Sequence, residues 1–456
     1  MSAYQVERVA VVLVGCLVLV GCSAPPPAVV VDDPPAVAPL KPPAPLVVSG
    51  AKDKAPVPEP TVSVTPADRT RIEAAEKSGA SAYESQNGGY EVRIERGSDA
   101  RAILEGLRGT KCVVGLSLEG GTVTDDALQH LDGCDFLERL TLVQCPNVTG
   151  AGFSVLPRLT RLKVLAISEC PVTDAACVWI GRAGSLEEVR LSATKVTDTG
   201  LRELGALAAL EAIGLERSVV TGTGFATRGW VKLRDVDAPN SAVDDAGMKA
   251  VADLPALATL RLDATKITDA GLDCLRRATK LTELSLAQTR ITDTGMVSLG
   301  GLERLRVLDV SNTLIRGAGF ARFPVRNGLQ KLTLSGSKFD DSGATYLARF
   351  TSLTVLSAAD CPVTEVGLVH LKELKKLTRV ELAGTKAGDA TARLLGALPE
   401  LEVAAFDGTP LTDAGLKALT AGPRLRLVEA RGTKVTKPGA AEAVRFGPPG
   451  LRVSAE

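Results

Sequence analysis

Few residues of this chain could do chemistry, and their spacing argues against catalysis. The 456 residues include nine cysteines and two histidines. His130 and His370 each stand two residues after a leucine of an apolar helix pattern, where a side chain should face solvent. With both histidines on the solvent side, no Ser–His–Asp or His–Cys set can be proposed, and no Cys-x-x-Cys motif supports a zinc or redox site. We therefore predict a protein that is not an enzyme and that uses no metal and no cofactor.

Acidic residues recur instead as the second member of a Thr-Asp pair, for example in Thr268-Asp269 and Thr292-Asp293. Repeated carboxylates could bind calcium, but Asp-x-Asp clusters are missing from the turns that hold these pairs. Each pair precedes a short apolar helix pattern. We therefore expect aspartates such as Asp293 to be helix N-caps, accepting hydrogen bonds from backbone N–H groups two or three residues on.

These pairs belong to a segment, Ile/Val-Thr-Asp-x-Gly-Leu, that returns about every 24 residues, with one step of 25 and one of 23. Fourteen positions hold its first residue in register: Val123, Val148, Val172, Val196, Val220, Val243, Ile267, Ile291, Ile315, Phe339, Val363, Ala387, Leu411 and Val435. Before one copy, Leu281-x-x-Leu284-x-Leu286 predicts a strand, and Met296 and Leu299 after it share one face of a short helix. Such a period predicts a solenoid whose units bury their apolar faces against one another.

The strand pattern recurs thirteen times between Leu137 and Leu425, after a variant that begins at Val113. Over residues 113–445 the chain resembles the leucine-rich repeat family. Cys, Ser or Thr, as at Cys145 and Cys170, stand where many such repeats carry Asn. This is similar to the cysteine-containing subtype of F-box ubiquitin-ligase receptors and many bacterial proteins. The resemblance implies an α/β solenoid of about fourteen 24-residue repeats, with a curved parallel inner sheet and short outer helices.

The first 22 residues are predicted to be a lipoprotein signal peptide. An apolar run of thirteen residues is too short to span a bilayer, and it ends in Leu19-Val20-Gly21-Cys22, which resembles the bacterial lipobox. Cys22 is the expected lipidation site; a second copy of the motif ends at Cys16. An uncleaved apolar anchor is the alternative. Either reading places the chain outside the cytoplasm, in the cell envelope and next to a membrane.

The remaining segments are predicted to be a spacer and two caps. Residues 23–66 are rich in proline and are expected to form a disordered but extended spacer, or less readily a ligand for a proline-binding domain. Residues 67–112 should cap the first repeat with helices near 69–77 and 99–107 and a strand at 90–94. Residues 446–456 should cap the last repeat.

The other cysteines and the two tryptophans are assigned to structure. Cys112 and Cys134 are the pair that could form a disulfide, which export would permit. Trp179 should be an exposed aromatic on the convex side, whereas Trp230 should fill a gap in the repeat that is one residue short.

Alternate side chains between the strand leucines point to the concave face, which we predict to be the binding surface. Seven acids and two arginines gather in its middle, and one edge turns apolar toward the C-terminus. The candidate residues are Glu188, Arg190, Glu216, Asp235, Asp237, Arg261, Asp263, Glu283, Asp309, Val355, Val403 and Leu427. Ordinary solvated strand surface is the alternative, because interface hot spots favour aromatic residues and this face has none.

These features favour a lipid-anchored, extracytoplasmic, monomeric protein that binds another protein through its concave face. Its formal net charge is zero, so nucleic acid is not expected as a partner. One alternative is a ubiquitin-ligase-type substrate receptor, which would need an F-box module where this chain has an apolar run and a proline-rich segment. The other is a structural envelope spacer without a defined ligand.

Overall fold

A computed structural model describes residues 62, 64–86, 88–325 and 327–455. Cys16, Cys22 and the predicted spacer up to residue 61 lie outside these described residues. The described chain opens with α1 (Pro66–Lys77), β1 (Ala80–Glu84), β2 (Tyr90–Ile94) and α2 (Ala100–Leu107). Among the described residues, no helix is both long enough and apolar enough to cross a bilayer.

After this opening segment, strands and outer helices alternate. The strands are β3 (Val113–Glu119), β4 (Arg139–Val143), β5 (Val164–Ser168), β6 (Glu188–Ser192), β7 (Ala212–Gly214), β8 (Asp235–Asp237), β9 (Thr259–Arg261), β10 (Glu283–Ser285), β11 (Val307–Asp309), β12 (Lys331–Thr333), β13 (Val355–Ser357), β14 (Arg379–Glu381), β15 (Val403–Ala405), β16 (Leu427–Glu429) and β17 (Arg452–Ser454). The α-helices are α3 (Asp125–Leu128), α4 (Asp174–Ile180), α5 (Asp198–Glu203), α6 (Asp245–Ala252), α7 (Asp269–Cys274), α8 (Asp293–Leu299), α9 (Asp341–Ala344), α10 (Glu365–Leu368), α11 (Asp389–Gly396), α12 (Asp413–Leu419) and α13 (Lys437–Phe446). Short 3₁₀ segments are η1 (Gln129–Leu131), η2 (Ala151–Arg158), η3 (Leu204–Ala206), η4 (Thr223–Phe225), η5 (Leu275–Arg277), η6 (Ala318–Arg322), η7 (Thr345–Arg349) and η8 (Val369–Glu373).

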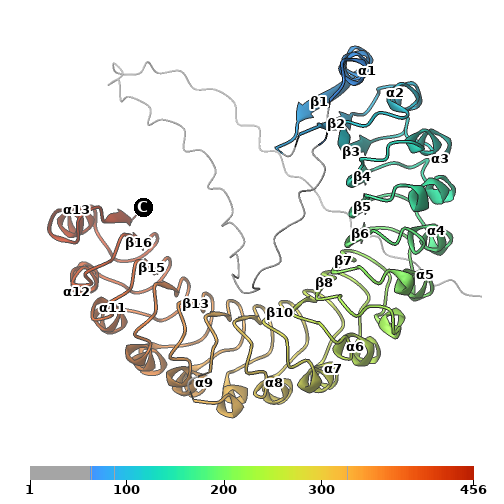
Figure 1. Cartoon of the computed structure of the whole chain (residues 1–456). Coiled ribbons are helices and arrows are strands. Elements are labelled where there is room, and N and C mark those ends of the chain that lie inside the picture. The colour runs from blue at the N-terminus through green and yellow to red at the C-terminus, as the bar shows by residue number, and fades with distance from the viewer. Residues whose placement is uncertain (1–61, 63, 87, 326, 456) are drawn as a thin grey trace, which may run out of the picture. The chain divides into compact units, whose positions relative to one another are not determined.

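The strands form one sheet in chain order. β1 pairs antiparallel with β2, and every later pairing, from β2–β3 to β16–β17, is parallel. Successive turns are in register, as in the pairing of Leu284 with Leu260 on one side and with Leu308 on the other. Figure 1 shows the strands along the inner side of the arc and the helices along its outer side. The predicted α/β solenoid is confirmed; β1 is a strand that the sequence pattern did not predict.

The repeated apolar residues form the core between the two layers. In the repeat that begins at Leu281, the strand leucines Leu281, Leu284 and Leu286 are fully buried, as are Met296 and Leu299 on its helix. Burying such a side chain contributes about 1.5–3 kcal/mol. No unit has this burial alone, because each apolar face is covered by the turns before and after it.

Most of the Thr and Ser residues that follow the strands satisfy a backbone carbonyl where the chain leaves the sheet, whereas Ser218 Oγ has no hydrogen-bond partner among the described residues and Ser337 Oγ contacts Cys361 Sγ. The hydroxyl of Thr289 donates to the Leu286 carbonyl oxygen at 2.6 Å, and that of Thr265 donates to Leu262 in the same way. The residue just before, Gln288, has φ near +59°, so the chain turns sharply at this point.

The predicted cap role of the recurring aspartate is wrong. Thr292 is the N-cap of α8, and its hydroxyl accepts from Thr294 N–H at 3.2 Å. Asp293 is the first helical residue, and its carboxylate accepts from the N–H groups of Arg316, Gly317 and Gly319 in the next repeat at 2.8–3.1 Å. The shorter threonine side chain reaches its own helix, whereas the aspartate reaches the unpaired N–H groups of the neighbouring turn.

A related contact recurs along the solenoid as a ladder, in which an aspartate accepts from both the N–H and the hydroxyl of the threonine one repeat later. The pairs are Asp125–Thr149, Asp174–Thr197, Asp198–Thr221, Asp245–Thr268, Asp269–Thr292, Asp341–Thr364, Asp389–Thr412 and Asp413–Thr436. The Thr-Asp motif therefore forms hydrogen bonds between neighbouring repeats and also caps the helix that it begins.

Candidate binding surface

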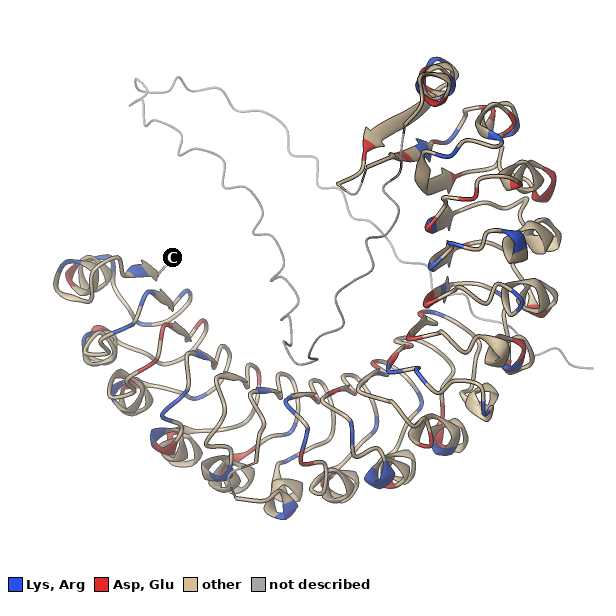
Figure 2. Ribbon diagram, in the orientation of Figure 1, with Lys and Arg blue, Asp and Glu red and all other residues tan. Residues whose placement is uncertain are grey.

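The register brings the predicted acidic residues into two neighbouring rows on the concave face. Arg190, Gly214, Asp237 and Arg261 are aligned on β6–β9, and Glu188, Ala212, Asp235 and Thr259 form the row beside them. Figure 2 shows charges of both signs along these inner strands. Because β7 offers only alanine and glycine here, a hollow of about 280 Å³ opens between the charged side chains of β6 and those of β8 and β9.

Most charges around this hollow already have partners. The guanidinium of Arg190 pairs with Glu188. Arg261 donates to Glu283 at 2.7 and 3.1 Å, and Arg234 lies 3.5 Å from Asp235. Arg190 and Arg261, the two arginines that line the hollow, are therefore neutralised locally, and the middle of the concave face remains acidic.

The outlying acids of the predicted set also have partners. Asp263 accepts from Ser285 Oγ at 2.5 Å and from Ala287 N–H at 2.8 Å. Glu216 lies 3.4 Å from Arg217. Asp309 accepts from the backbone and the hydroxyl of Ser311. These carboxylates are held in place and face the concave side.

Asp237 differs from the other acids, because no described residue gives its carboxylate a hydrogen bond or an ion pair. Burial raises the pKa of this carboxyl above its usual value, and the attraction of Arg261 and Arg190 offsets the effect only in part. The ionised form at neutral pH is thus costly in the free chain and available to an incoming cation.

We expect Asp237→Asn to stabilise the protein slightly, within about 1 kcal/mol after solvent screening. A raised folded pKa means that the wild type gains stability as the pH falls from that raised value toward the unfolded value of about 4, and the variant should lack this gain. Urea unfolding of the wild type and the variant at pH 7 and pH 4 measures the stabilisation by the substitution and the gain of the wild type at low pH. Asp235→Asn, which removes a partner of Arg234, is the matched control and should bring no gain.

The apolar edge expected toward the C-terminus is not continuous. Val307, Val355, Val403 and Leu427 do share one row of the concave face, and Val355, Val403 and Leu427 are half-buried. Lys331 stands between the first two, and Arg379 between the second and the third. Two cations therefore break the row into short apolar pieces.

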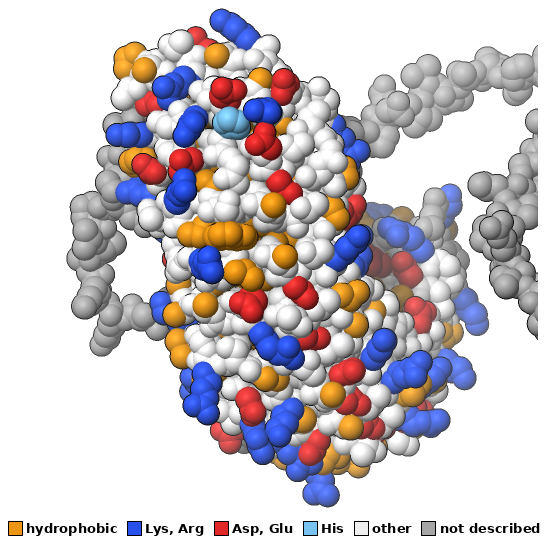
Figure 3. All heavy atoms as spheres, turned by 90° about the vertical axis from the view of Figure 1, so that its right-hand side faces the viewer, with side chains coloured by type: hydrophobic (Ala, Val, Ile, Leu, Met, Phe, Trp, Pro, Cys, Tyr) orange, Lys and Arg blue, Asp and Glu red, His pale blue; other side chains and the backbone are white. Residues whose placement is uncertain are grey.

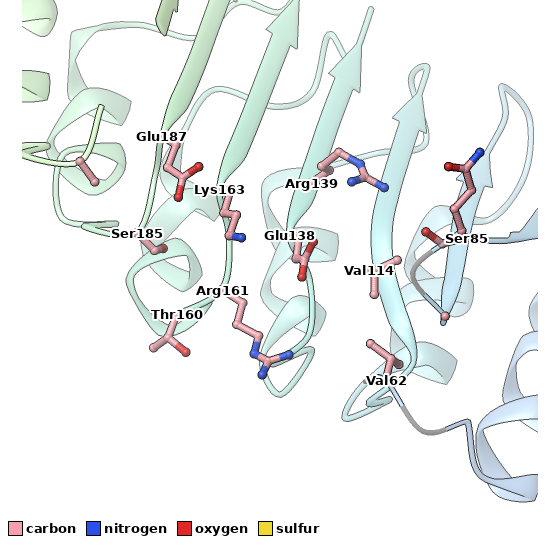
Figure 4. Close-up of a pocket in the computed structure, with 13 residues that line it drawn as sticks. Val62, Ser85, Val114, Glu138, Arg139, Thr160, Arg161, Lys163, Ser185 and Glu187 are labelled. Atoms are coloured by element: carbon pink, nitrogen blue, oxygen red, sulfur yellow. The ribbon is translucent and has the colours of Figure 1, made fainter. Parts of the chain in front are cut away.

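A second depression was missed by sequence reasoning. A trough of about 830 Å³ follows the start of β4–β6 and reaches the β1–β2 turn, with Val62, Ser85 and Arg139 among its lining residues. In Figure 4, Glu138, Lys163 and Glu187 follow one another, each directly before one of the neighbouring strands β4, β5 and β6. Their alternating charges were visible in the sequence, but the hairpin that closes the trough was not.

The trough and the hollow meet at the start of β6. Glu187 lines the trough, and the next residue, Glu188, lines the hollow. The inner face of the N-terminal half is thus hollowed from β2 to β9.

Figure 3 views the outer side of the turns around α3–α5, where charges of both signs surround a short hydrophobic band.

The cysteines are all free thiols in the described chain, so Cys112 and Cys134 form no disulfide. Burial raises the pKa of Cys112 to about 11, with Asp68 adding to the shift, and burial also raises that of Cys134. Thiols held protonated in this way are poor nucleophiles. Among the described residues, no cluster of His, Cys, Asp and Glu could hold a metal ion.

The predicted positions of the aromatic and histidine side chains need correction in part. Trp179 is half-buried rather than exposed, with the Arg182 guanidinium 4.9 Å above its ring. Trp230 is buried in the short repeat and donates from Nε1 to the Leu204 carbonyl oxygen at 2.9 Å. His130 and His370 are half-buried, not fully solvent-facing.

Comparisons with known proteins agree with this architecture. Residues 277–300 match the model of a leucine-rich repeat family, and no curated protein matches the sequence. An internalin from Listeria monocytogenes is 20% identical, with a TM-score of 0.52 over 71% of this chain and 92% of its own. A leucine-rich repeat protein of Leptospira interrogans is 16% identical, with a TM-score of 0.57 over 77% of this chain and 91% of its own.

A third solved structure, the mouse RP105/MD-1 complex, is 16% identical, with a TM-score of 0.57 over 79% of this chain and 62% of the matched chain. Identities this low show the fold alone. Taken with the in-register parallel sheet and the matched repeat, they make this chain a leucine-rich repeat solenoid.

Proposed function

We propose that this chain is a lipid-anchored, extracytoplasmic protein that binds another protein through the concave face of its N-terminal and middle turns. The observation that carries the proposal is the hollow on β6–β9, where the half-buried carboxylate of Asp237 has no partner within the described chain. A buried acceptor without a donor costs free energy, which a donor from a partner would recover.

The chemistry of the face indicates a partner with a basic segment. Arg190 and Arg261 are neutralised by Glu188 and Glu283, so the charge left over in the middle is negative. Electrostatic complementarity of this kind favours association with cationic surfaces. The solved RP105/MD-1 complex, a likeness of fold only, is consistent with a protein partner.

The partner is best found by photo-crosslinking in the native cell from a residue at the rim of the hollow, Thr259. An equivalent probe at Glu203, which is exposed on α5, is the control for contacts of the outer side. A product from Thr259 alone supports the binding function. Crosslinking from neither position would favour the structural spacer.

Charge reversal should then weaken the interaction. We expect Asp235→Lys, Asp237→Lys and Asp263→Lys together to reduce affinity for the crosslinked partner at least about tenfold, because like charges would face the basic segment. The control carries Glu105→Lys, Glu203→Lys and Glu303→Lys, which are exposed acids away from the concave face. Titration calorimetry of both triple variants measures the difference, and equal affinities would refute the acidic-face binding mode.

The anchor is a separate part of the proposal and has a separate test. The Leu19-Val20-Gly21-Cys22 motif supports lipidation at Cys22. Cys22→Ala should release the protein from the membrane fraction, whereas Cys16→Ala should leave it there. A wild-type protein recovered from the cytoplasm would remove the lipoprotein assignment and favour the receptor alternative.

A further inference from the structure

The outer layer contains less helix in the repeat that is one residue short. Its 3₁₀ segment η4 ends at Phe225, and residues 226–232 form no helix, although residues 226–229 correspond to the last turn of α6 in the next repeat. The neighbours on either side are η3 and the eight-residue helix α6. The 3₁₀ turn η4 packs against α6, but residues 226–232 add no further helical turn on this flank of α6.

The backbone of this segment is pulled toward η3. A Cβ added to Gly229 would lie 1.7 Å from the Gly205 carbonyl oxygen, so the two glycines allow direct backbone packing. Trp230 reinforces the approach, because its Nε1 donates to the Leu204 carbonyl oxygen at 2.9 Å. Because the segment is fixed on the η3 side, space opens on its other side, toward α6.

That space is a groove of about 670 Å³. Phe225 and Trp230, whose ring centroids are 5.3 Å apart, lie buried beneath it with Leu254. Its accessible apolar surface comes from Ala226, Ala246 and Ala250. The α6 wall is low, because Ala246 and Ala250 face the groove. An apolar groove of this size is within the range of small-ligand sites.

The charge left over at the groove is positive. Arg228 and Lys249 line it and are exposed, and no described residue forms a salt bridge with either side chain. The third charged lining residue, Asp253, is taken by Arg277 at 3.6 Å on the next turn. The groove therefore combines an apolar floor with two cations that lack counter-ions.

We propose that this convex groove binds a small amphiphile with an apolar body and one carboxylate. The apolar body lies along Ala226 and the α6 alanines, above the buried Phe225 and Trp230, and the carboxylate accepts from Arg228 and Lys249. Neither the apolar part nor the cationic part of this site overlaps the concave face. A negative result for the groove therefore leaves the proposed function untouched, and the reverse also holds.

The test uses the fluorescence of Trp230 and dodecanoate as the probe. The full chain with Cys22→Ala and Trp179→Phe retains Trp230 as its one tryptophan. We expect a saturable change in emission on titration with dodecanoate. Dodecanol, with the same chain length and no charge, should bind at least about tenfold more weakly.

Two sets of variants locate the site. Ala246→Phe fills the groove and should weaken dodecanoate binding at least about tenfold, whereas Ala270→Phe, at the equivalent position of α7, should leave it unchanged. Arg228→Gln with Lys249→Gln should bring the affinity for dodecanoate down to that for dodecanol. Circular dichroism and the unfolding midpoint verify that each variant is folded.

Three results would each overturn the proposal: no saturable emission change with dodecanoate, unchanged binding by Ala246→Phe, or equal affinity for dodecanol and dodecanoate. The first two remove the groove as a site, and the third removes the carboxylate from its ligand.

Discussion

Asp125→Ala is expected to lower the free energy of unfolding by about 3 kcal/mol, since hydrogen bonds to a charged group contribute about 1.5–3 kcal/mol each. The Asp125 carboxylate accepts from the N–H and the hydroxyl of Thr149 at 3.0 and 2.6 Å. It also accepts from the N–H groups of Gly150 and Gly152 at 3.1 and 3.0 Å. Alanine would leave these donors of the next repeat without an acceptor.

The neighbouring residue provides a matched control. Asp126 lies in the same helical turn but is exposed, and its partner, Arg101 at 3.0 Å, is exposed as well. Surface ion pairs of this kind contribute little, so Asp126→Ala should stay within about 0.5 kcal/mol of the wild type. Urea unfolding followed by circular dichroism compares the free energies of unfolding of the two variants. Equal losses would mean that an acid anywhere in the first turn of α3 is sufficient, and that the contact with the next repeat is not what stabilises the protein.

The same contact predicts the dependence on pH. Burial alone would raise the pKa of Asp125, but the hydrogen bonds from Thr149, Gly152 and Gly150 outweigh it and hold the pKa below its usual value. The unfolded carboxyl then binds a proton first. The stabilisation is therefore complete above the unfolded value of about 4 and is lost as the pH falls through the lower folded value. The difference between the wild type and Asp125→Ala should be full at pH 7 and shrink below about pH 4.

The contacts between the aspartates and the next repeat also show which part of the structure the sequence could predict. A period held from Val123 to Val435 determined the solenoid, because every copy places its leucines in the same core. The role of Asp293 could not be read from one repeat. Whether an acid caps its own helix or reaches Gly317 on the next turn depends on the stacking of the two repeats.

The candidate site could likewise be predicted from the sequence only in part. The inner rows of the concave face followed from strand alternation, so Asp237 and Arg261 lie where the pattern predicted them. The trough needs β1, whose pairing with β2 has no signature in the repeat. The convex groove needs Gly229 against Gly205, a contact between repeats that no single repeat reveals.

Gly295→Ala is expected to destabilise the protein by about 2 kcal/mol, as overpacking commonly does. A Cβ there would lie 2.5 Å from Asp269 Oδ1 and 2.9 Å from Leu272 Cδ1. The carboxylate cannot move away freely, because Thr292 holds it by its N–H and its hydroxyl at 2.7 and 2.6 Å. Gly106 on α2 is the control, because a Cβ there meets no atom within 4 Å, and alanine should stabilise that helix by up to about 1 kcal/mol.

A double-mutant cycle separates this clash from other effects of the substitution. In an Asp269→Ala background the nearest obstacle is gone, so Gly295→Ala should cost less, by at least about 1 kcal/mol; strictly additive losses would contradict the contact.

Other repeats of the chain already combine a changed acid with a changed glycine. Where Gly150 replaces the acid, the glycine position of the next repeat is Ala176, which a Cβ on Gly150 would meet at 2.3 Å. Where the longer Glu365 replaces it, that position is Thr391, whose N–H donates to Glu365. The Asp-x-Gly motif is therefore a pair of residues matched across two repeats, and changing one member alone should cost more than changing both.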